Sequence, residues 1–415
     1  MNTTDYAALV AMDWGDKTHA FACQKTGADG IEQGMIEATP EALHAWLEKL
    51  RETCGGRPVA LAVEAGRNAL LHALLEHAWL TVYPVHPATS ARFRKAFTPS
   101  GAKDDGPDAL VILTLLRQHR AQLTALVQDT PATRELAALV AARRGAVDAR
   151  TRLVNQLTSL LKGYFPQALT LAGDNLAAPL ALAFLRRFPE LADAQKAGAA
   201  RLRAFYAKHN VRSQERIEVR LALLARARPL SEDRAVIGPA RMELPRLLDL
   251  LEVETRHIAT MEGRIAEVFA AHPKAELFAS LPGAGAALAP RLLTAFGDVP
   301  ARYPNAQALQ KYAGLAPVRE KSQGRLWVHW RWAAPKFVRQ SFVEWAGQTV
   351  PRCAWANEFY RRQKTAGKGH HAILRALAFK WLRILWRCWT DGMPYDETRY
   401  LAALAKRGSL LNTTP

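Results

Sequence analysis

The sequence lacks the features of a secreted or membrane-anchored protein. Its 415 residues include four cysteines, which lie far apart and form no Cys-X-X-Cys pair, so it predicts neither a disulfide framework nor a cysteine zinc site. No apolar run approaches the roughly 20 residues that a membrane span needs. The first residues lack the basic flank and the long apolar core of a secretory signal. We therefore expect reduced thiols, a cytoplasmic location and no membrane partner.

Acidic residues are scarce only after the first third of the chain. Residues 1–130 contain 12 Lys and Arg against 15 Asp and Glu, whereas the remainder contains 44 against 23, which gives a net charge of +18. The chain length predicts two or three domains. The sequence therefore predicts a mildly acidic domain joined to strongly basic ones. Their partner is expected to be a polyanion such as nucleic acid. An anionic membrane surface is the competing interpretation, which the lack of a membrane-spanning apolar run disfavours.

Short apolar runs alternate with helical patterns from about residue 6 to residue 120. Apolar runs bounded by polar residues are typical of strands, and amphipathic spacing is typical of helices. Strands that alternate with helices favour a mixed or parallel sheet covered on both faces. The predicted strands are 7–12, 19–25, 31–38, 58–63 and 80–86, and the predicted helices are 41–51, 68–78 and 105–120.

The middle of the chain, from about residue 131 to residue 271, is nearly all helical in pattern. Residues 135–165 and 244–268 are long enough to form paired helices or a coiled coil, and they could pack against a second copy of the chain. A plain helical bundle is the equal alternative. From about residue 276 the pattern changes to a Pro-Gly turn at 281–285, a Trp- and Arg-rich segment and two closing helices.

Four carboxylates occur at positions where folding can gather them. Asp13 and Glu64 each follow an apolar strand, and sites in open α/β sheets lie at the carboxyl ends of strands. Asp105 and Asp108 are three residues apart at the start of a predicted helix, so they share a face. Any one acid alone is better explained as a helix cap or an exposed strand end, and only the combination indicates a site. Clustered carboxylates need cations to offset their repulsion, and Mg²⁺ or Mn²⁺ suits oxygen ligands.

The C-terminal segment combines positive charge with aromatic rings. Residues 301–400 hold 18 Lys and Arg against 6 Asp and Glu, and eight of the chain's 11 tryptophans. Cationic groups neutralise phosphates, while tryptophan rings either stack on unpaired bases or pack in a core, which is the favoured interpretation for most of them. The alternation of residues 327–332 predicts a β-strand with one buried face. The cationic residues expected to bind nucleic acid are Arg325, Arg331, Lys336 and Arg339.

Three N-terminal segments that contain the acids resemble the DEDD transposases of bacterial insertion sequences. They are AMDWGDKTH (residues 11–19), VEAGR (residues 63–67) and SGAKDDGPDA (residues 100–109). The N-terminal domain of that family is similar to Holliday-junction resolvases and has a ribonuclease H-like fold. The resemblance makes Asp13, Glu64, Asp105 and Asp108 the catalytic, metal-binding acids. The family pattern Lys-X-Asp-X-X-Asp-Ala selects Asp105 over Asp104.

The segment YAGLAPVREKS (residues 312–322) and the Trp-rich run after it resemble the C-terminal domain of the same transposases. In that family a serine just after a Gly-Leu-Ala-Pro-like turn acts as the nucleophile. Ser322 matches by position, although Gln323 stands where the family usually has glycine. A serine needs a base or a metal to activate it, and no histidine is obviously placed for this, since His329 is seven residues away. The resemblance implies that the metal cluster of the N-terminal domain supplies the activation.

The resemblance also implies a domain order. We predict a ribonuclease H-like α/β catalytic domain at 1–125, a helical or coiled-coil connector at 126–275, a mostly helical C-terminal transposase domain at 276–400 and a tail at 401–415. The predicted activity is that of a DNA transposase, a recombinase that cleaves and rejoins strands by phosphoryl transfer.

The partners implied by the resemblance are the DNA of the element ends and target, a structured guide RNA, and further copies of the chain in a dimer or tetramer associated with the nucleoid. Two alternatives remain. One is a metal-dependent, structure-selective DNA nuclease, which needs the acids but not Ser322. The other is a catalytically inactive nucleic-acid-binding derivative of a transposase, whose function would survive substitution of the acids.

Overall fold

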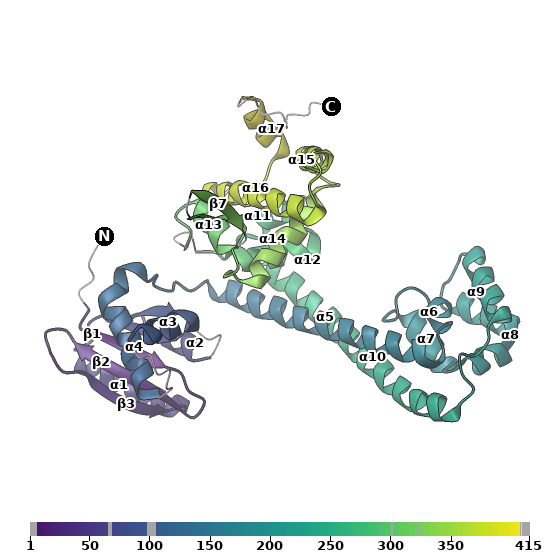
Figure 1. Cartoon of the computed structure of the whole chain (residues 1–415), viewed down its shortest axis with the longest axis horizontal. Helices are drawn as coiled ribbons and strands as arrows, with labels where there is room; N and C mark the ends of the chain where they lie inside the picture. Colours follow the sequence, from purple (N-terminus) through teal and green to yellow (C-terminus); the bar gives the residue numbers. More distant parts are fainter. Residues whose placement is uncertain are drawn as a thin grey trace. The chain divides into compact units, whose positions relative to one another are not determined.

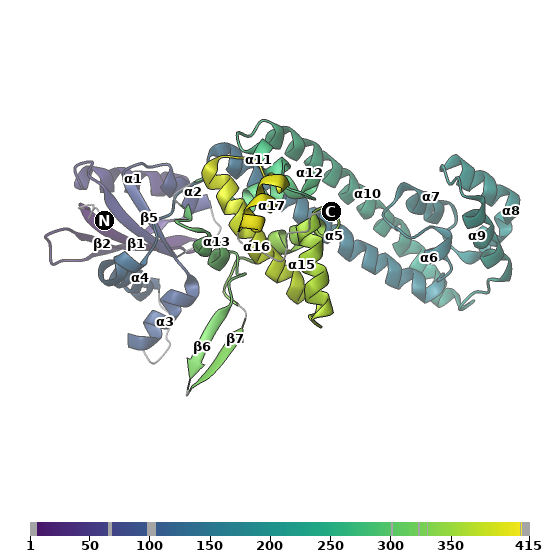
Figure 2. The same ribbon diagram turned by 90° about the horizontal axis from the view of Figure 1, so that it is seen from above.

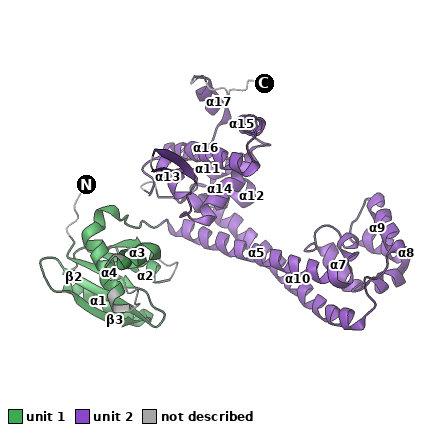
Figure 3. Cartoon of the chain, in the orientation of Figure 1, with its two compact units in different colours: residues 1–128 green, residues 129–415 purple. Residues whose placement is uncertain are grey.

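The computed structural model describes residues 6–64, 69–97, 105–299, 302–322, 324–329, 331–406 and 408, without the side chains of 69, 96, 97 and 105–107. The chain divides into two compact units, residues 1–128 and residues 129–415 (Figure 3). Unit 1 contains a mixed α/β sheet with its helices, and unit 2 is almost entirely helical. The predicted combination of an α/β domain with a mostly helical remainder is therefore confirmed.

Unit 1 is built around a five-stranded sheet. Its strands are β1 (Ala8–Asp13), β2 (Thr18–Lys25), β3 (Glu32–Glu37), β4 (Val59–Glu64) and β5 (Leu80–Val85). They lie in the order β3-β2-β1-β4-β5. The pairs β1–β2 and β2–β3 are antiparallel, whereas β1–β4 and β4–β5 are parallel. All five predicted strands are confirmed, and the parallel part places the carboxyl ends of β1 and β4 side by side.

Helices cover both faces of this sheet. They are α1 (Pro40–Thr53), α2 (Ala69–Leu75), α3 (Pro87–Phe97) and α4 (Asp105–His119), followed by the short 3-10 helix η1 (Arg120–Gln122). Side chains alternate along each strand, so Val10 and Met12 of β1 pack in one core with α1 and α2. The alanines Ala11, Ala60 and Ala62 point to the other face, where they pack with α4. Their small size lets α4 lie close to the strands that end in Asp13 and Glu64.

Helix α3 is the one α-helix of unit 1, among the described residues, that the sequence patterns did not predict. Five of its 11 residues are polar or basic and three are alanines, so it has no continuous stripe of large apolar residues for a periodicity argument to detect. Local chemistry starts it instead. Pro87 stands at the first helical position, where its missing N–H is harmless, and the Nδ1 atom of His86 accepts a hydrogen bond from the Ala88 backbone N–H at 3.1 Å.

Unit 2 is organised by two long helices, α5 (Pro131–Tyr164) and α10 (Arg234–Ala270), which run side by side (Figure 1). The Thr130 side chain caps the start of α5. An ion pair between Arg264 and Glu135, at 2.7 Å, links the two helices. The two long predicted helices therefore exist and pair with each other within one chain.

A helical lobe lies at each end of this pair (Figure 1). The lobe at the end of α5 and the start of α10 contains α6 (Ala168–Leu171), α7 (Pro179–Arg187), α8 (Leu191–Lys208) and α9 (Gln214–Arg226). The other lobe contains α11 (Ala275–Ala279), α12 (Gly285–Phe296), α13 (Ala306–Tyr312), α14 (Lys336–Thr349), α15 (Ala354–Thr365), α16 (His370–Asp391) and α17 (Glu397–Lys406). The predicted turn at 281–285 connects α11 to α12, as expected.

Three tryptophans form the centre of the second lobe. Trp345, Trp355 and Trp381 are fully buried, and the Trp381 ring lies 4.9 Å from that of Trp345 and 4.7 Å from that of Trp355. The Trp381 indole N–H donates to Thr349 Oγ1 at 2.9 Å, which satisfies its buried polar atom. Trp389 is buried as well. Trp386 packs against the same core, so five of the eight C-terminal tryptophans belong to it and the interpretation of most of them as core residues is confirmed.

The same lobe carries a two-stranded hairpin, β6 (Val318–Ser322) and β7 (Arg325–His329), that projects away from the helices (Figure 2). The predicted strand exists, but the prediction of one buried face was wrong. Leu326, Trp327 and Val328 of β7 are all more than half exposed. The physical reason is that β7 pairs only with β6, and the described part of the chain packs no element over either face of this ribbon.

Two expectations from composition can be compared with the structure. All four cysteines are free thiols, and burial raises the pKa of Cys23 to about 11. No helix within the described residues is long and apolar enough to cross a membrane.

Candidate functional site

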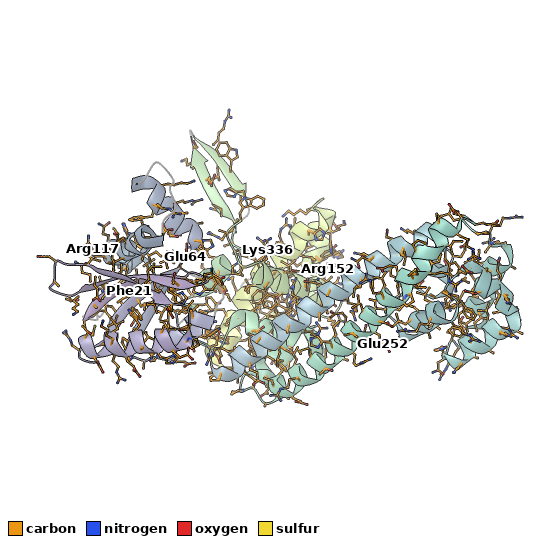
Figure 4. The ribbon with its side chains drawn as sticks, turned by 90° about the horizontal axis from the view of Figure 1, so that it is seen from below. Phe21, Glu64, Arg117, Arg152, Glu252 and Lys336 are labelled. Carbon is orange, nitrogen blue, oxygen red and sulfur yellow. The ribbon has the colours of Figure 1, made fainter. Side chains whose placement is uncertain are left out.

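Asp13 and Glu64 are the last residues of two adjacent parallel strands, β1 and β4. The register aligns Met12 with Val63, so the two acids follow at the same level at the carboxyl edge of the sheet; Glu64 is labelled in Figure 4. By alternation, each acid points to the face that α4 covers. Both are partly buried. The structure therefore places these two acids next to each other, on the α4 side of the sheet.

Helix α3 reaches two of the acids through residues that lie one turn apart. The Ser90 hydroxyl donates to Glu64 Oε1 at 2.6 Å. One guanidinium nitrogen of Arg94, Nη1, contacts both carboxylate oxygens of Asp108, at 2.6 Å for Oδ2. Sequence reasoning missed Ser90 and Arg94, because their partners belong to β4 and α4 and no local spacing connects them.

Asp105 is the first residue of α4, but its side chain lies outside the described residues. Its place beside the other acids therefore stays a prediction. Within the described part of the chain, no group of three or more His, Cys, Asp or Glu side chains is arranged to hold a metal ion. The donors that are described, Asp13, Glu64 and Asp108, offer carboxylate oxygens, which are the ligands that Mg²⁺ and Mn²⁺ prefer. The positively charged Arg94 side chain already forms an ion pair with Asp108.

Ser322 is the last residue of β6 and lies exposed at the tip of the hairpin. In the antiparallel register it stands directly opposite Arg325. Residues opposite each other project from the same face, with Cβ atoms about 5 Å apart. Trp327, two residues along β7, projects from this face too. The serine hydroxyl thus has a cationic group and an exposed ring beside it, while Lys321 projects from the opposite face.

His329 is not placed to activate the Ser322 hydroxyl. Its Nε2 atom contacts Glu320 Oε1 at 2.8 Å, and the register places it opposite Val318, at the base of the hairpin. No described side chain is hydrogen-bonded to the Ser322 hydroxyl.

The other predicted cationic residues lie where the hairpin joins the helices. Lys336 is exposed at the start of α14 (Figure 4). Arg339, one turn further on, donates to the Arg331 carbonyl at 3.3 Å. A cavity of about 200 Å³ at this junction is lined by Arg331 and by Arg375 of α16, which the sequence did not single out. Arg325, Arg331, Lys336 and Arg339 thus form a cationic region along the hairpin and its base.

Two transposase families match different parts of the chain. Residues 10–166 match a family described as a transposase of the DEDD, IS110 type, and residues 275–361 match the IS116/IS110/IS902 transposase family. The first match includes the acids of unit 1, and the second includes the hairpin of unit 2. Together the two matches cover more than half of the chain.

Proteins of similar length match almost end to end. The chain is 28% identical over 399 residues to the candidate transposase of the IS117 mini-circle of Streptomyces coelicolor, covering 95% of this chain and 96% of that protein. It is 28% identical over 414 residues to an uncharacterized 44.8 kDa protein of insertion element IS116 from Streptomyces clavuligerus, covering 96% and 100%. An uncharacterized 42 kDa protein of insertion element IS900 from Mycobacterium paratuberculosis is 28% identical, with 83% and 85% covered.

Unit 1 is an α/β unit with acids at its strand ends, and unit 2 is helical and basic. Together with the family matches and the relatives, these features define a transposase of an insertion element. The chain belongs to the IS110 family of DEDD transposases. Membership implies an activity that cuts and rejoins DNA.

Proposed function

We propose that unit 1 is a ribonuclease H-like catalytic domain in which Asp13, Glu64, Asp105 and Asp108 bind Mg²⁺ or Mn²⁺. The observation that carries this proposal is the position of Asp13 and Glu64, at the same level on adjacent parallel strands and on the face where α4 presents Asp108. Carboxylates so close together repel unless a cation offsets their charge. A bound divalent ion would offset that charge and stabilise the charge that develops on a scissile phosphate.

We further propose that Ser322 is the nucleophile. Its hydroxyl oxygen forms a bond to phosphorus and loses its proton, while the bond from phosphorus to one sugar oxygen of the DNA strand breaks and that oxygen takes up a proton. A sugar hydroxyl of another strand then attacks the phosphoserine, which reseals the DNA and returns the proton to the serine. The exposure of Ser322 supports this role, because DNA can reach it, and the Arg325 guanidinium on the same face can offset phosphate charge.

The nucleic-acid partners follow from the family and from charge. We propose that the hairpin and its base, through Arg325, Arg331, Lys336 and Arg339, contact the DNA of the element ends and target. A structured guide RNA that selects those sites is proposed from the resemblance, and the net charge of +18 suits a complex with two polyanions.

We propose that the active form contains two or more copies of the chain, since two element ends and a target must be held together. Apolar side chains on one face of α10 support this. Met242, Leu250 and Val253 are exposed there, where a second copy would cover them.

The test uses purified full-length protein with its element ends, a target, the flanking noncoding transcript and Mg²⁺. Wild type should give joined recombinant DNA and a covalent protein–DNA adduct, and both should be absent from Ser322→Ala and Asp13→Ala. Lys321→Ala is the matched control, because Lys321 is the neighbour of Ser322 on the opposite face of the hairpin, and it should keep the adduct. Cleavage by Ser322→Ala without an adduct would replace this proposal with a hydrolytic nuclease.

A further inference from the structure

We propose that Arg94 is an internal counter-ion that occupies the acid site before a divalent cation binds, and that the cation displaces it toward the DNA phosphate. Ser90, one turn earlier on the same helix, is proposed to fix the Glu64 carboxylate. Both are positioning residues. This inference rests on the proposed metal-binding role of the acids.

The geometry of α3 is the first step. Residues four apart on a helix lie on the same face, so one face of α3 presents both Ser90 and Arg94. Ser90 contacts Glu64, from the end of β4, and Arg94 contacts Asp108, from the first turns of α4. A single helix therefore holds two of the proposed acids, which come from different elements of unit 1.

The nature of the Arg94 contact is the second step. Within the described residues this contact uses one nitrogen, Nη1, which bridges both oxygens of Asp108, whereas a guanidinium offers five N–H donors in a planar fork. The contact is reachable from solvent, because the side chains of Arg94 and Asp108 are 22% and 16% exposed. A divalent cation binding the same two oxygens competes directly with Arg94. The released guanidinium, held by the same helix, then has its donors available for a phosphate.

The Ser90 contact has a different role. The residue is buried, and its single hydroxyl proton is shared between Glu64 Oε1 at 2.6 Å and the Pro87 carbonyl at 3.0 Å. The Ser90 hydroxyl engages only one carboxylate oxygen of Glu64, so this contact leaves the other oxygen for a cation. Hydrogen bonds of this kind orient metal-binding carboxylates. Ser90 therefore assists cation binding, whereas Arg94 opposes it.

These opposite roles give opposite predictions, measured on the full-length protein without nucleic acid. Arg94→Ala should bind Mn²⁺ about fivefold more tightly than wild type, since a partly exposed ion pair no longer competes. Ser90→Ala should bind it more weakly. The thermal midpoint of Arg94→Ala should lie below that of wild type without metal, because Asp108 loses its partner, and the difference should close at saturating Mg²⁺. With DNA, Arg94→Ala should cleave more slowly and Arg94→Lys should recover part of the rate.

The controls distinguish the counter-ion role of Arg94 from the proposed metal-binding role of the acids, on which it rests. Arg92→Ala removes an equal charge from an exposed position of α3 and should match wild type in Mn²⁺ affinity. Asp13→Asn should abolish Mn²⁺ binding. Suppose that Asp13→Asn abolishes Mn²⁺ binding, but Arg94→Ala binds Mn²⁺ more weakly than wild type or stays less stable than wild type at saturating Mg²⁺. The metal site then stands and the counter-ion role is refuted. If wild type itself binds no Mn²⁺, both the metal site and the counter-ion role are overturned.

Discussion

Two tryptophans of unit 2 should respond to substitution in opposite ways. Trp327 is 52% exposed on the hairpin face that carries Ser322, whereas Trp381 is fully buried between two other indoles. We predict that Trp327→Ala weakens binding of single-stranded DNA with little effect on folding. Trp381→Ala should instead destabilise the lobe.

The magnitudes follow from burial. An aromatic ring that stacks on one base contributes about 1–3 kcal/mol, so Trp327→Ala should raise the dissociation constant about 5- to 150-fold. Its effect on the free energy of unfolding should stay within about 0.5 kcal/mol, as for other exposed positions. Trp381→Ala removes a large core side chain and should lower that free energy by about 3–5 kcal/mol.

The assay is fluorescence anisotropy of a labelled single-stranded oligonucleotide at several salt concentrations, combined with urea unfolding. Trp327→Ala should leave the salt dependence unchanged, because stacking releases no counterions, whereas Arg325→Ala should reduce its slope by about one. The reasoning is refuted if Trp327→Ala binds DNA like wild type. It is equally refuted if Trp327→Ala unfolds the protein, since the hairpin would then be part of a core.

Two further predictions concern the stability of unit 2. Burial lowers the pKa of His272 in the folded chain, so its stabilising contribution is complete above the unfolded pKa of about 6.5. The contribution is lost as the pH falls, by at most about 1.4 kcal/mol per pH unit. In urea unfolding at pH 7 and pH 5, His272→Gln should therefore lose less free energy of unfolding between the two pH values than wild type. Gly283 has φ of 73°, and an added Cβ would lie 2.6 Å from the Gln348 carbonyl oxygen. Gly283→Ala should therefore lower the free energy of unfolding by about 1–3 kcal/mol, while Gly263→Ala, in open space on α10, should raise it slightly in the same assay.

Sequence patterns predicted those elements whose own side chains determine their structure. The strand that ends at Asp13 and the strand that ends at Glu64 are nearly continuous apolar runs because both faces are covered, and this pattern is local. Helix α3 has no such pattern. It is started by Pro87 and His86 and held by contacts to other elements, so its existence depends on information that lies elsewhere in the chain.

The hairpin shows a different limit. Alternation predicted a strand at residues 327–332, and the structure has one at Arg325–His329, but alternation alone does not say whether anything covers the apolar face. In a wide sheet another layer would cover the apolar face, whereas this ribbon has two strands only. The register that brings Arg325 opposite Ser322 likewise needed the structure, because a sequence pattern does not fix which residues of two strands pair.

The exposure of Ser322 bears on the proposed use of a serine nucleophile in addition to carboxylates. Metal-assisted attack by water on a phosphodiester ends in free strand ends, and resealing them then requires an outside source of energy. Attack by a serine hydroxyl exchanges one phosphate ester for another, so the bond energy is kept and the reverse attack rejoins DNA without a cofactor. A serine at the tip of a projecting hairpin, with Arg325 beside it and no described residue bonded to its hydroxyl, is suited to receiving a strand and releasing it again. Under the proposed mechanism the acids would cut the strand, and the hairpin serine would conserve the bond energy that rejoining needs.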